Sequence, residues 1–180
     1  MKQCRLFGAW RRWRPWGIGV LAAVLLIVLP SCGARRDVPA GAVLSAILMR
    51  EEHCPSGTVY SASAGEGEKG YFSESLCTAL YGDEAPPVEW SLIADYAIFL
   101  TAAEHPTELA VFRCRSVADA EEVARLCSRR LTLLRQYWRG SEYESYPLGG
   151  RVVILGSYVV MAVCSDSLRA VGEARNALGS

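Results

Sequence analysis

Arginine and aromatic side chains gather in one stretch of this 180-residue chain and are its clearest candidates for a binding surface. Eight of the 14 basic residues after Cys32 lie between Arg113 and Arg151. A guanidinium binds phosphate or carboxylate through two parallel hydrogen bonds, and aromatic rings pack against the flat faces of ligands. We expect an anionic envelope polymer or a protein partner at the following residues, called here the Arg–aromatic patch: Arg125, Arg129, Arg130, Arg135, Trp138 and Tyr143.

The same residues also fit a second interpretation without a partner. On a long helix, Glu121 would pair with Arg125 one turn later, and the other arginines would lie on a solvent-facing surface. Aromatic side chains at the end of such a helix commonly close a hydrophobic core. Both interpretations stay open on the sequence alone.

Catalytic and metal-binding motifs are not found in the sequence. It contains no Gly-x-Ser-x-Gly, Walker or Cys-x-x-Cys motif, and no Gly-x-Gly-x-x-Gly motif directly before a helix. His53 and Cys54 follow two glutamates and could form a nucleophile pair or a metal site, but neighbours in sequence point apart and Pro55 indicates a helix end. His105 precedes Pro106 in an expected hairpin turn. We therefore expect no catalytic residues, no metal and no cofactor.

Five cysteines follow Cys32, and their odd number and scattered spacing indicate no disulfide framework. Cys114, Cys127 and Cys164 fall on apolar faces, where cysteine packs as a small hydrophobic residue. Cys54 and Cys77 lie outside those faces, so they are the pair to consider if a disulfide forms.

A targeting segment explains how charge is distributed along the chain. Residues 1–31 hold five basic residues and no acidic one, and the rest holds 14 basic and 19 acidic residues, a net charge of −5. This balance argues against nucleic-acid binding. The apolar run from Trp16 to Leu29 has 14 residues, which suits a signal peptide better than a membrane span of about 20.

The end of this run resembles a bacterial lipobox, Leu29-Pro30-Ser31-Cys32. The box implies cleavage before Cys32 and lipidation of its thiol; the alternative is an ordinary cysteine beyond a secretion signal. We expect a lipoprotein-type signal peptide at 1–31, a short tether at 32–39 and a single domain at 40–180. The domain would then be lipid-anchored at the extracytoplasmic face of the cell membrane.

Helices and loops are expected in the first half of the domain. Residues 40–52 have helical apolar spacing, and Pro55 and Gly57 end the pattern. Residues 61–70 are small, polar and glycine-rich, which predicts a loop, and 83–87 predict a turn. Ser73 would cap a short helix that ends at Leu80.

The second half predicts two strand pairs, each followed by a helix. Strands are expected at 92–100, 108–115, 151–155 and 158–164, with Gly156-Ser157 as a hairpin turn. Ser116 would cap a long helix whose apolar face includes Val117 and runs to Trp138, and Ser165 or Asp166 would cap a last helix with Leu168 facing inward. The predicted fold class is α+β: a four-stranded antiparallel sheet with helices on one face, a ββαββα-like second half and an N-terminal helix before it. Phe112 and Val160 should be buried beneath the long helix.

Five segments of the domain carry a resemblance to known proteins: Tyr81-Gly82-Asp83, Glu108–Phe112, Ala118-Asp119-Ala120, Arg151–Ile154 and Tyr158–Met161. Together they resemble a family of small bacterial lipoproteins, the domain of unknown function 4358, over about Ala40 to Leu178. It implies a lipoprotein-like location and a compact α/β domain. It implies no activity and assigns no residue a role.

Taken together, these features predict a non-catalytic binding or assembly module of the cell envelope. The alternative is a ligand-carrying lipoprotein or an envelope hydrolase. An enzyme would bring polar groups together in a cleft, whereas a binding module would present an aromatic or apolar surface.

Overall fold

A computed structural model describes residues 37–51, 54–81, 90–102 and 104–180. The predicted signal peptide at 1–31, Cys32, His53 and the predicted turn at 83–87 lie outside these residues. Only the last part of the predicted tether, Asp37 to Pro39, lies within them.

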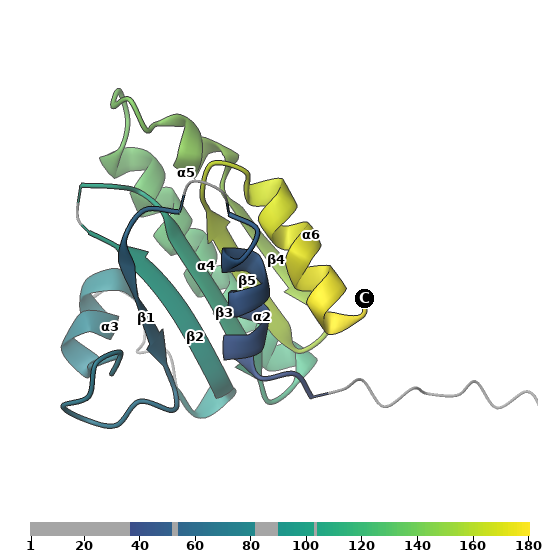
Figure 1. The fold of residues 1–180 in the computed structure, drawn as a ribbon. Coiled ribbons are helices and arrows are strands. Elements are labelled where there is room, and N and C mark those ends of the chain that lie inside the picture. Colours follow the sequence, from purple (N-terminus) through teal and green to yellow (C-terminus); the bar gives the residue numbers. More distant parts are fainter. Residues whose placement is uncertain (1–36, 52–53, 82–89, 103) are drawn as a thin grey trace, which may run out of the picture. The chain divides into compact units, whose positions relative to one another are not determined.

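The described residues build one antiparallel sheet of five strands in the order β1-β2-β3-β5-β4 (Figure 1). The strands are β1 Gly57–Ser61, β2 Ile93–Thr101, β3 Glu108–Cys114, β4 Arg151–Leu155 and β5 Tyr158–Val163. The α+β class is confirmed, but the prediction of four strands was wrong. The missed strand, β1, is a short segment that pairs along the outer edge of β2.

Helices cover both faces of the sheet, which corrects the expectation of one covered face (Figure 1). They are α2 Ala40–Leu48, α3 Glu74–Tyr81, α4 Val117–Tyr137, α5 Ser145–Gly149 and α6 Ser167–Leu178, with a 3₁₀ turn at Trp90–Leu92. Helices α2 and α6 pack together over one face, and α4 crosses the other face with α3 beside it. The reason lies in β3 and β5, which are apolar on both sides and therefore require a helix layer on each.

Side chains alternate between these two layers as strand geometry requires. Phe112 is 1% exposed and packs in the core beneath α4, as predicted. Val160 is equally buried, but it lies in the opposite core beneath α2 and α6, so its predicted position was wrong. Val117 and Leu168 were expected to face inward, yet they are 56% and 68% exposed because both lie in the first turn of their helix, at the edge of the packed face.

The helix caps and the hairpin follow local sequence signals. The Ser116 hydroxyl accepts a hydrogen bond from the Asp119 amide at 3.1 Å, and Asp166 accepts one from the Arg169 amide at 2.9 Å. Each bond satisfies an amide that has no partner within its helix. Gly156 has a φ of 67°, which glycine adopts without strain at a hairpin turn.

The chain enters the domain through a set of polar contacts at one end of the sheet. The Tyr158 hydroxyl accepts a hydrogen bond from the Val38 amide at 3.0 Å and donates one to the Val38 carbonyl at 2.7 Å. Arg113 forms an ion pair with Asp37. The Asp95 carboxylate, beside a register shift in β2, accepts a 2.8 Å hydrogen bond from the Ala40 amide and caps α2 from a distance of 55 residues. We call these contacts the entry clamp.

Replacing Phe112 with alanine should lower the free energy of unfolding by about 3–5 kcal/mol, because a large cavity would open beneath α4. Leu168→Ala serves as the control: since Leu168 is mostly exposed, its loss should stay within about 0.5 kcal/mol. Urea unfolding of the purified protein measures both changes. A small loss for Phe112→Ala, or a large one for Leu168→Ala, would contradict the observed facing of these elements.

Candidate ligand-binding site

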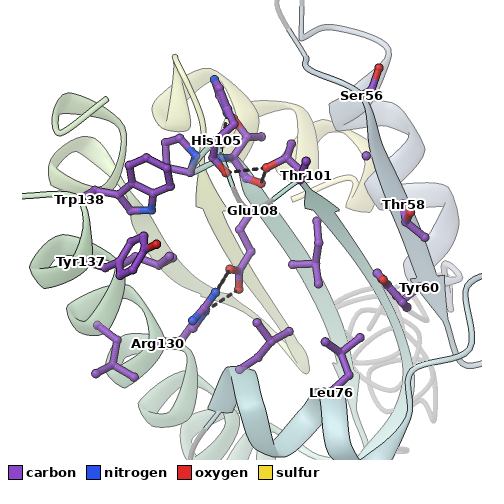
Figure 2. A pocket seen from close by; sticks show the side chains of 18 of the residues that line it. Ser56, Thr58, Tyr60, Leu76, Thr101, His105, Glu108, Arg130, Tyr137 and Trp138 are labelled. Atoms are coloured by element: carbon purple, nitrogen blue, oxygen red, sulfur yellow. Dashed lines mark hydrogen bonds and ion pairs between the residues drawn. The ribbon is translucent and has the colours of Figure 1, made fainter. Parts of the chain in front are cut away.

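A large cavity lies on the α4 face of the sheet, at the end where β2 finishes and β3 begins (Figure 2). Its volume is about 1090 Å³, at the upper end of the range for small-molecule sites. One wall comes from β1, the opposite wall from the last turns of α4, and α3 contributes Leu76 and Leu80. The cavity is therefore built by elements from both halves of the domain.

A buried ion pair lies within the cavity lining. The Glu108 carboxylate is only 4% exposed and receives hydrogen bonds from Arg130 Nε at 3.0 and 3.2 Å and from Arg130 Nη2 at 2.8 Å. Such a bidentate contact holds the guanidinium and the carboxylate in a fixed relative geometry. Removing either partner would leave an uncompensated buried charge, so the pair must act as a unit.

The two walls that flank this ion pair differ in chemistry. Thr58 and Tyr60 of β1, together with Ser56 just before it, line one side of the cavity, and the Tyr60 ring packs edge-on against Phe72 at 5.7 Å. From α4, Tyr137 and Trp138 bring aromatic rings whose centroids are 5.4 Å apart. Tyr137 is 76% exposed, so its ring is available at the mouth of the cavity.

His105 fixes the loop between β2 and β3 at the rim of the cavity. Its Nδ1 accepts a hydrogen bond from the Thr107 amide at 3.2 Å, and its ring lies 4.7 Å from Tyr143 and 5.3 Å from Tyr146. Desolvation by these neighbours lowers the pKa of His105 from its usual value of 6.5. The neutral ring therefore ties the β2–β3 loop to the segment after α4.

The six residues of the predicted Arg–aromatic patch do not form one surface in the structure. Arg130 and Trp138 line the cavity, whereas Tyr143 belongs to the rim cluster around His105. Arg135 donates hydrogen bonds to the carbonyls of Pro147 at 2.9 Å and Gly150 at 3.3 Å, and so holds α5 against α4. The remaining two are exposed: Arg129 lies on the surface, and Arg125 pairs with Glu122, rather than with the expected Glu121.

Sequence reasoning did not select Glu108 or His105 as residues of a site, nor Ser56, Thr58 and Tyr60 on the β1 side. A signal existed for Glu108, since a glutamate at the start of a mostly apolar strand needs a cationic partner if it is buried. The partner itself lies 22 residues later in the chain and could not be inferred from spacing. His105 was correctly placed in a turn, but its role depends on tyrosines that only the fold brings close.

All five cysteines among the described residues are free thiols. Cys54 packs against the core under α2 and α6 and Cys77 against the core under α4, so the sheet separates the pair considered for a disulfide. The other three are buried, as predicted. Burial raises the pKa of Cys114 to about 11 and that of Cys164 to about 12, and also raises that of Cys127, so these thiols stay protonated.

Among the described residues, no three His, Cys, Asp or Glu side chains gather where they could hold a metal ion. No helix in the described part of the chain has both the length and the apolar character needed to cross a membrane. Comparisons with protein-family models, with curated proteins and with solved structures return no significant match. The resemblance noted in the sequence therefore stays a prediction.

Acidification should weaken the domain partly through His105. Because its pKa is lowered in the folded state, the unfolded chain binds the proton more readily, so the stability that the neutral ring contributes is present above the usual pKa. It is lost as the pH falls through 6.5 toward the lower folded pKa.

The test compares urea midpoints at about pH 7.5 and about pH 5 for the wild type and for His105→Asn, which keeps an acceptor for the Thr107 amide without titrating there. The wild type should lose more stability than the variant. Equal losses would show that protonation of His105 does not oppose folding.

Proposed function

We propose that this chain is a lipid-anchored binding module that acts without catalysis at the outer face of the cell membrane, with the cavity as its ligand site. The observation that carries the proposal is the cavity itself, which joins a buried Glu108–Arg130 pair to exposed aromatic rings from α4. A site with a few fixed polar groups and aromatic walls is typical of ligand recognition.

The state of the polar groups in the cavity favours binding over hydrolysis. A carboxylate that acts as a general base or nucleophile directs its negative charge at the substrate's reacting atoms. The negative charge of Glu108 is instead paired with two nitrogen atoms of Arg130, so the carboxylate can accept a hydrogen bond from a ligand but is not free to attack it. The His105 Nδ1 is likewise occupied by the Thr107 amide. Glu108 and His105 therefore stabilise the structure around the cavity, which supports the binding module over the alternative of an envelope hydrolase.

The entry clamp supports an outward-facing cavity. Glu108 and Arg113 lie at opposite ends of β3, about 17 Å apart at the usual rise of a strand. Arg113 binds Asp37, and the five residues from Cys32 to Asp37 can span at most about 17 Å. If Cys32 carries the lipid, this short connection keeps the clamped end of the sheet near the membrane, and the cavity end points away from it.

The proposed partners follow from that orientation. A cavity that faces away from the bilayer would meet the polymers of the cell envelope, and the exposed Arg129 would add an electrostatic contact to anionic ones. The net charge of −5 after Cys32 does not suit nucleic acid. The resemblance to the domain of unknown function 4358 is part of the same proposal, since that family consists of lipoproteins.

Lipidation of Cys32 is tested by growing cells with an alkyne-bearing fatty acid and separating membrane from soluble material. The wild type should be labelled and sediment with membranes, because two or more acyl chains give stable anchoring. Cys32→Ala should lose the label, and Cys54→Ala, which changes a cysteine within the folded domain, should keep it. Equal labelling of wild type and Cys32→Ala would overturn the anchor.

Binding through the cavity is tested by co-sedimentation of the purified full chain with isolated cell-wall sacculi. Tyr137→Ala should lower the bound fraction, because it removes an exposed ring at the cavity mouth while leaving the core intact. Tyr71→Ala is the matched control, since Tyr71 is a partly exposed tyrosine outside the cavity lining. If the two variants bind alike, or if the wild type stays in solution, the cavity is not the site of an envelope ligand.

A further inference from the structure

The charges that line the cavity cancel. Of the described residues in its lining, only Glu108 and Arg130 carry full charges, and each neutralises the other. An anionic ligand would compete with Glu108 for the Arg130 guanidinium and leave a buried carboxylate without its partner. A cationic ligand would do the same to Arg130. An ionic ligand therefore gains little here, and an uncharged one leaves the pair intact.

The ion pair nevertheless keeps hydrogen-bonding capacity for a ligand. Within the described residues, Arg130 uses Nε and Nη2 on Glu108 and makes no hydrogen bond through Nη1, while Glu108 Oε1 accepts only the longest contact, at 3.2 Å. The pair thus offers donors and an acceptor side by side. A hydroxyl group, which both donates and accepts, matches that arrangement. A purely apolar ligand would leave these groups buried and unsatisfied.

The walls of the cavity offer hydrogen-bonding groups on one side and flat aromatic rings on the other. Thr58 and Tyr60, which carry hydroxyl groups, line the side formed by β1, with Ser56 just before that strand, and the rings of Tyr137 and Trp138 stand opposite at the end of α4 (Figure 2). A ligand that fits between them needs hydroxyl groups along its edges and an apolar face for the rings. Its size must suit a volume of about 1090 Å³, which is generous for a single small molecule.

A peptide fits this arrangement less well. Peptides that bind beside a sheet commonly add a strand and pair with the backbone of an edge. Thr58 and Tyr60 enter the cavity with their side chains, so the ligand meets the face of β1 and not its backbone edge.

From these observations we infer that the cavity binds an uncharged oligosaccharide. Its sugar hydroxyls bind the Glu108–Arg130 pair and the β1 hydroxyls, and a sugar face packs on Tyr137 and Trp138. This inference rests on the proposed function, because it names the class of ligand for the same site.

The test is calorimetric titration of the full chain, purified in a detergent without a sugar headgroup. The probes are neutral tetrasaccharides of glucose, N-acetylglucosamine, mannose and galactose, an acidic tetrasaccharide of galacturonate, and an uncharged peptide of four residues. At least one neutral sugar should bind with a dissociation constant of about 1 mM or tighter. Its affinity should stay the same between about 0.1 and about 1 M salt, since no net charge is neutralised.

Three variants test which cavity side chains contact the sugar, and none of them changes Glu108 or Arg130. Tyr137→Ala should weaken binding about three- to tenfold through the lost ring contact. Thr58→Val keeps the shape of the β1 wall but removes a hydroxyl, and should weaken binding about fivefold. Tyr71→Ala should bind as the wild type does.

The remaining outcomes separate this inference from the proposed function. Tighter or salt-sensitive binding of the acidic sugar, or tighter binding of the peptide, would overturn the uncharged sugar and keep the cavity as a binding site. Failure of all four neutral sugars, with sacculi still bound in a Tyr137-dependent way, would have the same meaning. Loss of sacculus binding as well would overturn both.

Discussion

Glu108 opens the central strand β3 with a carboxylate that is almost wholly buried, and the balance of that charge constrains much of the domain. Only Arg130 balances it among the described residues, so α4 must cross the sheet at the height where its fourth turn meets the start of β3. This contact also determines where the last turns of α4 stand, and with them Tyr137 and Trp138. The ion pair therefore joins the longest helix to the start of β3 beside the cavity, in addition to the buried apolar face of that helix.

The other end of β3 is governed by a second set of polar contacts. Arg113 binds Asp37, and its strand neighbour Tyr158 holds the backbone of Val38. One strand thus carries a buried charge that lines the cavity at its start, and near its end a charge that pairs with Asp37. Because these groups lie on opposite faces as well as at opposite ends, an anchor before Asp37 would not crowd the cavity.

The two helical layers explain why the domain can support an open cavity at all. Buried apolar side chains on both faces of β3 and β5 give the sheet two cores, so the α4 face need not be filled at its far end. Beyond Leu134 the core gives way to polar and aromatic side chains, and the rim cluster of His105, Tyr143 and Tyr146 closes that end by ring contacts. Side chains that such contacts already hold in place lose little conformational entropy when a ligand binds.

The sequence by itself determined the local features: the cap at Ser116, a cap at either Ser165 or Asp166, the turn at Gly156, four of the strands and the apolar face that places Phe112 under α4. These follow from side-chain periodicity and from backbone preferences within a few residues. Tertiary structure alone decided the fifth strand, because β1 is stabilised by its pairing with β2 about 40 residues away. It also decided the second helical layer and the Glu108–Arg130 contact, because a buried charge or an uncovered apolar face specifies that a partner must exist, while only the assembled chain determines which residue supplies it.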